Sequence, residues 1–285
     1  MRLAILADIH GNKPALDAAL ADARAQGAER LIVNGDAVNR GPDGVAVLET
    51  LLSLGVEFTL GNHDALMTLW WNRDPEIPAD WFADPFFDSF TWCARDLDRA
   101  GLLGIFDAWP MTLRIELPGA PALVIAHGTP DHYREGVGRR MSEARLRELF
   151  EENHAGVLVG SHTHVPFEWR SGDLLAVNTG AVGAPFNRDT RAQYLLLTLE
   201  GGLWVPEVRF VPYDLNAVLR NYETSGLLAE GGLSAHIFRA ELPTAYPLYA
   251  RFWDWAETSN HLRDWAAWRE FEQTVAPGFG LTRTA

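Results

Sequence analysis

Short apolar runs alternate with helical patterns through the first part of the chain. The runs Leu3–Ala7, Leu31–Asn34 and Val56–Leu60 have the length of buried strands, and each leads into a polar loop that contains glycine. Amphipathic patterns follow the first two runs, from Pro14 to about Gln26 and from about Asp43 to Leu54, and proline is well tolerated in a first helical turn. Strands that alternate with helices in this way indicate βαβ units and an α/β fold.

Further strands are predicted over residues 112–117, 123–126 and 157–159, with a helix over Met141–Glu152. Short strands around Phe167 and over 174–177, 194–199 and 204–210 are expected to be antiparallel, because tight turns such as Glu200–Gly202 join them. Residues 72–108 are rich in Trp, Phe, Asp and Pro, and they predict a largely helical insertion over the sheet edge. We therefore expect a core over 1–211 that contains this insertion, and a helical, Trp-rich extension over 212–285 packed on the core.

Composition narrows the class of protein. Apolar residues make up 47% of the 285 residues, enough for a large core without disulfides. Cys93 is the single cysteine, so no intrachain disulfide can form, which predicts a reducing compartment. The apolar run at Met1–Ala7 is too short for a signal peptide, and no run reaches the roughly 18 apolar residues of a membrane span. We expect a soluble, cytoplasmic protein with no membrane partner.

The charge of the chain bears on its partners. The formal net charge is −14, and Lys13 is the only lysine. An acidic surface repels a polyphosphate backbone, so duplex nucleic acid is not an expected partner. A small anionic substrate remains compatible with this charge, because bound divalent metal ions invert the local field.

Five strand-end loops carry residues of the kinds that bind metal ions. They hold carboxylate, amide and imidazole groups, in chain order Asp8 and His10, Asp36, Asn62 and His63, His127, and His162 and His164. In open α/β sheets, ligands bind at the carboxyl ends of the strands, so these groups are expected to converge there. A single Asp or His in such a loop is usually a turn former or a surface residue. The joint pattern, repeated over five loops, is what favours a metal site.

The number and chemistry of these groups favour two metal ions. With His63 set aside, three carboxylate or amide groups and four imidazoles, without a thiolate, are too many ligands for one ion, and a carboxylate such as Asp36 can bridge two. Imidazole suits Zn, Fe, Ni and Mn, whereas carboxylate and amide oxygens favour harder ions such as Mn and Mg. Mn is therefore our first choice for the two divalent ions, with Fe, Ni, Zn and Mg as alternatives.

The same residues resemble the motif set of a known family. The chain is similar to the calcineurin-like metallophosphoesterase superfamily in five blocks: Asp8-x-His10-Gly-Asn, Gly35-Asp36 with Arg40-Gly41, Gly61-Asn-His-Asp64, His127-Gly and Gly160-Ser-His-x-His164. A sixth block, Asn178-Thr-Gly-Ala-Val-Gly183, resembles that of the small bacterial and archaeal phosphodiesterase branch of this superfamily. The resemblance spans about residues 1–210. It implies a four-layer α-β-β-α sandwich of two mixed sheets flanked by helices.

The resemblance also implies roles for individual residues. A first metal ion would be held by Asp8, His10, Asp36 and His164, and a second by Asp36, Asn62, His127 and His162. His63 would contact the leaving-group oxygen or the developing charge, and Asp64 would orient His63. Asn12 and Arg40 are weaker candidates for contacts with phosphate oxygens, a role that suits the planar fork of arginine.

Three functions compete. The block Gly35–Gly41 resembles that of serine/threonine phosphatases and diadenosine tetraphosphatases, which are the alternative if the enzyme prefers monoesters. Asn39 stands where that block has Asp, and Asp64 stands where the protein phosphatases usually have Glu, so the sequence favours a metal-dependent phosphodiesterase. A non-catalytic protein-binding scaffold is the third hypothesis, and the complete ligand set argues against it.

The aromatic residues of the extension bear on the substrate. Trp253, Trp255, Trp265 and Trp268 lie among Arg251, Arg263 and Arg269, which permits a wall on which a nucleobase stacks. Large aromatic residues at helical spacing more often form a buried face, and we favour that interpretation, as we do for Phe86, Phe87 and Phe90. The expected partner is a small phosphoester, by analogy nucleotide-like. The sequence does not specify the oligomeric state.

Overall fold

The structure is a computed structural model, and it describes residues 1–279 of the 285. Its strands are β1 (Arg2–Leu6), β2 (Arg30–Asn34), β3 (Glu57–Thr59), β4 (Thr112–Ile115), β5 (Leu123–Ala126), β6 (Val157–Gly160), β7 (Phe167–Ser171), β8 (Leu174–Asn178), β9 (Ala192–Glu200) and β10 (Leu203–Val211). Within the described residues they form two five-stranded sheets, in the orders β10-β9-β1-β2-β3 and β4-β5-β6-β8-β7. Both sheets are mixed, because β1, β2 and β3 run parallel, as do β5, β6 and β8, while the other pairings are antiparallel.

The helices of the described chain are α1 (Lys13–Ala25), α2 (Gly44–Ser53), α3 (Asn62–Trp71), α4 (Asp88–Arg99), α5 (Glu143–Glu152), α6 (Leu215–Thr224), α7 (Leu227–Glu230), α8 (Gly232–Thr244), α9 (Leu248–Thr258) and α10 (Trp265–Thr274). Short 3-10 helices lie at η1 (Ala79–Ala83), η2 (Pro85–Phe87), η3 (Leu103–Ala108) and η4 (Ala276–Phe279). None of the helices within residues 1–279 combines the length and the apolar character needed to cross a bilayer.

The layers follow from which face of each strand is apolar. Ile5, Ile125 and Leu195 belong to a buried cluster between the two sheets, because strand side chains alternate between faces. On the outer face of the first sheet, Leu6 and Val33 pack with Leu16 and Leu48 of α1 and α2, and α5 covers the outer face of the second sheet. The order is therefore helix, sheet, sheet, helix, which confirms the predicted four-layer sandwich.

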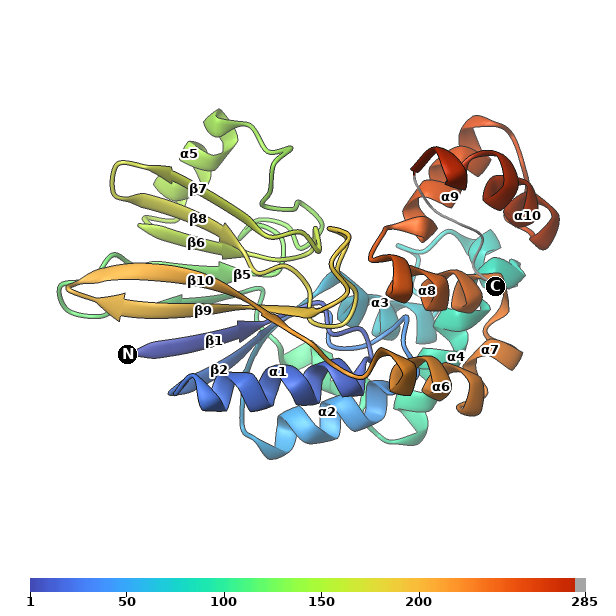
Figure 1. The fold of residues 1–285 in the computed structure, drawn as a ribbon, viewed down its shortest axis with the longest axis horizontal. Helices are drawn as coiled ribbons and strands as arrows, with labels where there is room; N and C mark the ends of the chain where they lie inside the picture. The colour runs from blue at the N-terminus through green and yellow to red at the C-terminus, as the bar shows by residue number, and fades with distance from the viewer. Residues whose placement is uncertain (280–285) are drawn as a thin grey trace.

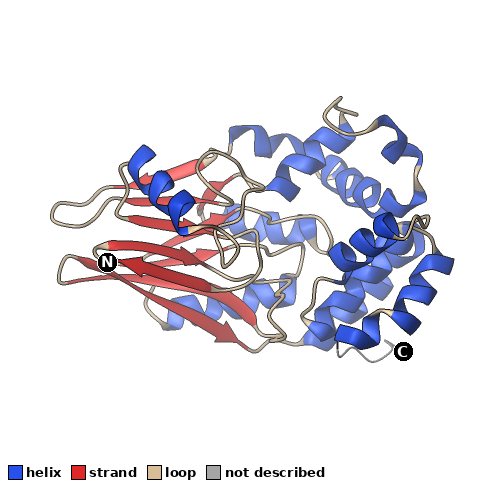
Figure 2. Ribbon diagram, turned by 90° about the horizontal axis from the view of Figure 1, so that it is seen from above, coloured by secondary structure: helices blue, strands red, loops and turns tan. Residues whose placement is uncertain are grey.

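The strands and most of the remaining helices occupy different halves of the molecule. Figure 2 shows the strands gathered on one side and the insertion and C-terminal helices on the other. The carboxyl ends of β1 and β2 point toward the helical half (Figure 1). The strand-end loops therefore lie where the two halves meet.

Two local predictions are corrected by the structure. The block after β3 was expected to be a loop, but Asn62, His63 and Asp64 form the first turn of α3, because the Asp64 side chain returns to accept a hydrogen bond from the Gly61 N–H. The strand over 174–177 was expected to be antiparallel. β8 is antiparallel to β7 but parallel to β6, since the β7–β8 hairpin turns the chain back into the direction of β6.

The aromatic residues of the C-terminal helices pack against the insertion and against one another. The Trp253 ring lies 5.4 Å from that of Trp81 and 5.7 Å from that of Phe87, centroid to centroid. Trp268 is buried against Phe252, whereas Trp265 remains 43% exposed. One apolar cluster contains residues of α1, α4 and α8. These contacts confirm the buried-face interpretation for Trp253 and Trp268.

This packing predicts a large contribution of Phe252 to stability. Phe252 is fully buried, and the rings of Phe86, Trp255, Trp268 and Phe271 surround it. Phe252→Ala should lower the free energy of unfolding by about 3–5 kcal/mol, because the protein would not fully fill the cavity. Urea denaturation followed by circular dichroism measures it. Trp265→Ala is the control, with an expected loss below about 1 kcal/mol; an equally small loss for Phe252→Ala would contradict the packing described.

Candidate metal centre

Two buried carboxylates lie at the centre of the candidate site. Asp8 follows β1 and Asp36 follows β2, and neither side chain is exposed. The backbone N–H of His162 donates to Asp8 Oδ2 at 3.2 Å, and that of His63 donates to Asp36 Oδ1 at 2.7 Å. The opposite oxygens, Asp8 Oδ1 and Asp36 Oδ2, are buried without a hydrogen-bond partner among residues 1–279. Buried anionic oxygens of this kind are costly unless they meet a cation.

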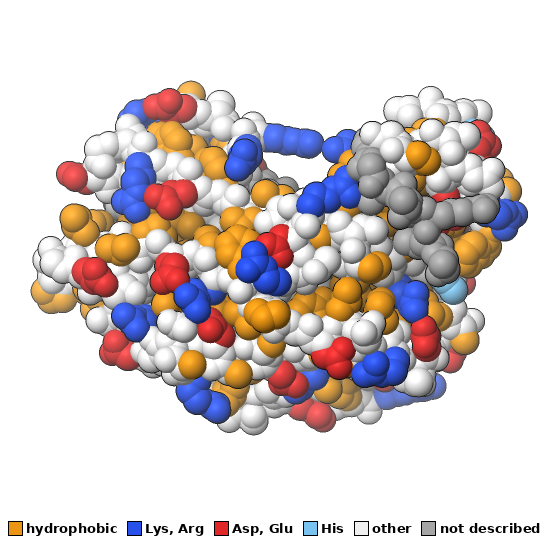
Figure 3. All heavy atoms as spheres, in the orientation of Figure 1, with side chains coloured by type: hydrophobic (Ala, Val, Ile, Leu, Met, Phe, Trp, Pro, Cys, Tyr) orange, Lys and Arg blue, Asp and Glu red, His pale blue; other side chains and the backbone are white. Residues whose placement is uncertain are grey.

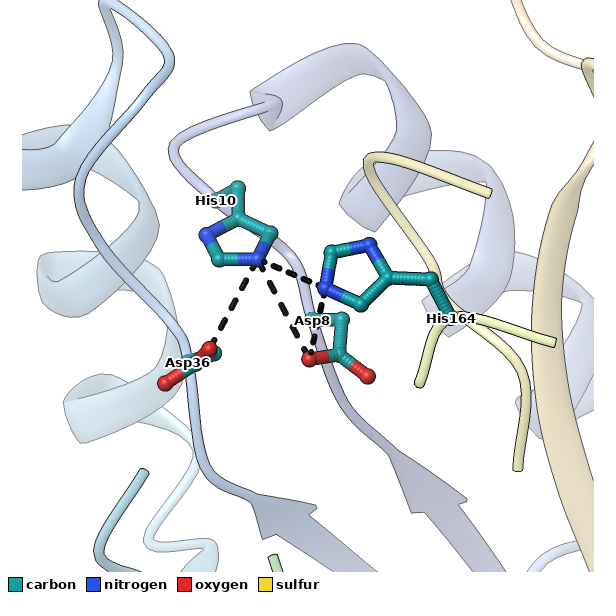
Figure 4. Close-up of side chains that lie close together, drawn as sticks. All are labelled: Asp8, His10, Asp36 and His164. Carbon is teal, nitrogen blue, oxygen red and sulfur yellow. Dashed lines mark hydrogen bonds and ion pairs between the residues drawn. The ribbon is translucent and has the colours of Figure 1, made fainter. Parts of the chain in front are cut away.

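Imidazole groups surround these two oxygens. His164 Nε2 lies 3.3 Å from Asp8 Oδ1, and His10 Nε2 lies 3.7 Å from Asp36 Oδ2 (Figure 4). The two Nε2 atoms are 3.2 Å apart. One potential ligand atom from each of Asp8, His10, Asp36 and His164 lies within 4.8 Å of the others. Carboxylate oxygen and imidazole nitrogen at this separation form a donor set that fits a divalent metal ion.

A second group of potential ligands adjoins the first through Asp36. His127 Nε2 lies 3.3 Å from Asp36 Oδ2 and 3.1 Å from Asn62 Oδ1. His162 Nδ1 lies 2.8 Å from the same amide oxygen. All seven residues predicted as ligands therefore lie together, in two adjoining groups that share Asp36.

Hydrogen bonds behind the rings fix their orientation. In three of the histidines Nδ1 faces a backbone carbonyl oxygen: His10 with Val38, His127 with Asn34, and His164 with Ala184. A carbonyl oxygen only accepts, so Nδ1 carries the hydrogen and the Nε2 lone pair faces the carboxylates. Metal-binding histidines are commonly held in this way.

The backbone at these positions adopts conformations that the local sequence does not favour. Left-handed φ values occur at five of the seven predicted ligands: Asp8 (51°), His10 (49°), Asp36 (54°), His162 (62°) and His164 (58°). Such a φ costs a residue other than glycine about 1–2 kcal/mol. Hydrogen bonds between loops hold it, including His10 N–H to the Asp36 carbonyl at 3.0 Å. Gly61 permits the close approach, because a Cβ there would lie 2.2 Å from Asp36 N.

A polar network beneath the carboxylates ties the two sheets together. The Asn34 amide donates to the Ala126 carbonyl and to Ser161 Oγ, both at 2.8 Å, and its oxygen accepts from Thr59 Oγ1 at 2.6 Å. Asn34 is fully buried and joins the ends of β2, β3, β5 and β6. In the sequence Asn34 appears only as the last residue of the predicted strand Leu31–Asn34, with no further role predicted. The signal in the sequence that could have indicated the role of Asn34 is an amide at the last position of a buried strand.

A proton on His127 balances part of the negative charge in the site when no cation is present. Burial by itself would lower the pKa of His127, but Asp36 and Asp8 raise it to about 10. Burial would raise the pKa of Asp36, yet the facing His127 and His63 hold it well below its usual value. Burial, followed by the charge of His127, lowers the pKa of His162 to about 4. At neutral pH the cluster therefore contains an ionised Asp36, a protonated His127 and a neutral His162, and a divalent ion can replace the proton of His127.

The predicted catalytic pair is arranged differently from the expectation. His63 stands beside His10, with 4.9 Å between ring centroids, and burial lowers the pKa of His63 to about 3. Asp64 was expected to orient His63. Its carboxylate instead accepts from the backbone N–H groups of Asp36 and Ala37 at 2.7 and 2.9 Å, because its place in the first turn of α3 directs it toward that loop.

Asn39 takes the orienting position. Asn39 Oδ1 accepts from the Arg40 backbone N–H at 2.7 Å, which turns the amide nitrogen toward His63 Nδ1 at 2.8 Å. The amide nitrogen can only donate, so the hydrogen of the neutral His63 ring lies on Nε2. In the sequence Asn39 stands out only as a difference from a family pattern, and no role is predicted for it.

Of the two predicted substrate contacts, Asn12 has a different role in the structure, whereas Arg40 lies beside the site. The amide of Asn12 donates to the Gly183 carbonyl at 3.0 Å and lies 3.2 Å from the Tyr213 hydroxyl, while its oxygen caps α1 through the Ala15 N–H. The donors of Asn12 are thus used within the protein, and its predicted phosphate contact is replaced by a structural role. Arg40 is 87% buried beside the site, and Glu241 binds one edge of its guanidinium at 2.9 Å.

Fold and site together define an α/β protein with a metal-binding group at the carboxyl ends of its strands. Residues 1–166 match the family model of the calcineurin-like phosphoesterases. The match covers more than half of the chain, which therefore belongs to this family of metal-dependent phosphoester hydrolases.

Known proteins resemble the chain over most of its length. The uncharacterized protein MJ0912 of Methanocaldococcus jannaschii is 23% identical over 228 residues, which cover 75% of this chain and 88% of the relative. A metallophosphoesterase from Sphaerobacter thermophilus superposes with a TM-score of 0.65 at 23% identity, over 86% of this chain and 99% of the other. The hypothetical protein PH1004 from Pyrococcus horikoshii gives 0.69 at 20% identity, over 86% and 98%. At these identities the structural likeness shows the fold.

Metal binding is predicted to release a proton from His127. Its pKa of about 10 leaves the metal-free ring protonated at neutral pH, and coordination requires the neutral ring. The apparent affinity should rise by up to about tenfold per pH unit from about pH 6 to 9. Calorimetry of Mn²⁺ binding, repeated in buffers with different ionisation enthalpies, counts the protons. His127→Gln should release about one proton fewer; equal release by both proteins would contradict this assignment.

Proposed function

We propose that this protein hydrolyses phosphodiesters with two divalent metal ions, Mn²⁺ being the first choice, that share the carboxylate of Asp36. The observation that carries the proposal is the unpaired oxygen Asp36 Oδ2. It lies 3.7 Å from His10 Nε2 in one group of potential ligands and 3.3 Å from His127 Nε2 in the other. A carboxylate oxygen in this position suits a bridge between two ions.

The remaining residues fit the two proposed ion sites. Asp8 and His164 would complete the first site, and Asn62 and His162 would complete the second. Divalent ions bound there would supply Lewis acidity and activate water for attack on phosphorus. The mixture of carboxylate, amide and imidazole donors supports Mn²⁺, and metal analysis of the purified protein would distinguish it from Fe, Ni, Zn and Mg.

His63 supports departure of the leaving group. Its neutral ring, held by Asn39 at Nδ1, carries a hydrogen on Nε2 and can donate a hydrogen bond to the leaving oxygen as negative charge develops there. A positioned hydrogen-bond donor to developing negative charge contributes about 10²–10³ to a rate. Arg40 lies close to His63, because the Arg40 backbone N–H donates to the Asn39 side chain that holds His63. Arg40 is the proposed phosphate contact.

The approach to the site suits a small anionic substrate. Figure 3 shows the surface hollowed between the sheet that carries α5 and the C-terminal helices, with Lys and Arg side chains on both sides of the hollow. An open groove of about 380 Å³ is lined by Arg139, Pro166, Phe167, Glu168 and Val208, and Pro166 follows closely after His164 in the chain. A groove of this size accepts a nucleotide-sized ligand, and basic side chains near it favour an anion despite the net charge of −14.

The proposal is tested first by a matched pair of rates. Metal-stripped protein, reloaded with Mn²⁺, is assayed on a chromogenic phosphodiester and on the corresponding monoester. Diester hydrolysis should exceed monoester hydrolysis and should stop on chelation. His63→Ala should lower kcat by about 10²–10³, because the leaving oxygen loses its hydrogen-bond donor.

Each other outcome selects an alternative. A preference for the monoester would move the protein to the phosphatase or diadenosine tetraphosphatase type. A protein that shows no turnover and binds no metal would favour the protein-binding scaffold. His132→Ala is the matched control, because His132 is an exposed histidine outside the cluster, and its substitution should leave both rates unchanged.

A second prediction concerns Asn39. In Asn39→Asp the new carboxylate would accept from His63 Nδ1–H, so a neutral ring would have no hydrogen on Nε2. Only the imidazolium could then donate, and its pKa would rise beside the new charge. The pH profile of kcat should therefore gain a fall in activity as pH rises through the new His63 pKa. An unchanged profile would remove Asn39 from the proposed mechanism.

A further inference from the structure

The side chain of Arg40 is held by the C-terminal helices. Arg40 Nη1 donates to Glu241 Oε2 at 2.9 Å, and the guanidinium carbon lies 4.9 Å from the ring centroid of Phe238. Phe238 and Glu241 are one helical turn apart on α8, so a single face of that helix supplies both contacts. The Tyr222 hydroxyl of α6 also donates to the Arg40 carbonyl at 2.9 Å.

Glu241 is itself firmly placed. Only 3% of its side chain is exposed. Its second oxygen, Oε1, accepts from the Tyr249 N–H in the first turn of α9 at 2.8 Å. Both oxygens therefore have partners. Burial raises the pKa of Glu241, and the Arg40 guanidinium and the Tyr249 N–H at the positive end of α9 oppose that rise. The result is a buried ion pair with no net charge.

This ion pair adjoins the metal centre. Gly41, the next residue after Arg40, donates its N–H to the His10 carbonyl, and Asn39, the residue before it, contacts His63. A small, partly open space of about 10 Å³ is bordered by His10, Arg40 and Glu241, enough for about one oxygen atom the size of a water. Arg40 Nε is buried without a hydrogen-bond partner among residues 1–279. The guanidinium therefore retains a donor beside the site.

We infer that Glu241 sets the charge that the substrate phosphate meets, and thereby favours a diester over a monoester. The inference rests on the proposed function. A phosphodiester carries one negative charge and a monoester carries two near neutral pH. Arg40 paired with Glu241 offers hydrogen bonds without net charge, whereas an unpaired Arg40 would offer a full positive charge and would favour the dianion. Glu241 is a positioning residue, because it acts through Arg40.

The experiment measures selectivity for anions in the full-length protein loaded with Mn²⁺. Calorimetry at about pH 8 gives Kd for inorganic phosphate, which is mainly a dianion there, and for dimethyl phosphate, a monoanion. In Glu241→Gln the Kd of phosphate should fall roughly tenfold, as expected for one uncompensated charge nearby, while that of dimethyl phosphate changes by less than about threefold. The ratio of kcat/KM for monoester over diester should rise in the same direction.

Glu223→Gln is the matched control. Glu223 pairs with Arg239 on α8, and its substitution leaves an arginine of the same helix without its partner. Selectivity should not change in this variant. If Glu241→Gln does not fold, Arg40→Gln tests the same charge balance, because it leaves the negative charge of Glu241 without its partner. Phosphate binding should then weaken roughly tenfold more than dimethyl phosphate binding.

The outcomes separate this inference from the proposed function. Unchanged selectivity in folded Glu241→Gln, an equal change in Glu223→Gln, or no phosphate binding at all would overturn the role of Glu241. If the protein hydrolyses neither ester but Glu241→Gln still shows the expected shift in phosphate selectivity, the role of Glu241 is supported. That result would contradict only the proposed function. Restored wild-type selectivity in the double variant Arg40→Gln, Glu241→Gln would support the charge balance, because both charges are then absent.

Discussion

Two carboxylate oxygens, Asp8 Oδ1 and Asp36 Oδ2, are enclosed in the protein without a hydrogen-bond partner among residues 1–279, and the site is organised around them. Backbone N–H groups hold the outer oxygen of each carboxylate, so the inner oxygens cannot turn away. The unfavourable burial of negative charge must be compensated by a positive group. A proton on His127 compensates part of it in the metal-free protein, and divalent ions are the natural replacement.

The rest of the fold serves to keep these groups in place. Five of the seven predicted ligands have a left-handed backbone, which no isolated loop would retain. The loops keep it because they hydrogen bond to one another and because Asn34 joins strand ends of both sheets. The apolar layers on either side of each sheet make the strand ends rigid supports. A rigid support is what a precise metal site requires.

The C-terminal helices have a part in the site as well as in stability. Their aromatic residues pack on the insertion, and this packing places α8 against the loop that follows β2. Arg40 then meets Glu241, which lies about two hundred positions further along the chain. The family core holds the seven predicted ligands, while this later part of the chain supplies the acidic partner of Arg40 beside them. Differences in substrate preference can arise from such a region without any change in the ligands.

The sequence by itself determined the elements and the membership of the site. The spacing of apolar residues placed β1, β2, α1 and α2 within a few residues of their observed bounds. The polar residues at the strand ends identified all seven members of the cluster. Both patterns could be found in the sequence because they depend on residues that are neighbours in the chain. Only the tertiary structure decided the partners of single atoms. Asn39 rather than Asp64 orients His63, Asn12 caps a helix, and Glu241 holds Arg40. These assignments depend on distances between segments far apart in sequence, which local periodicity does not contain.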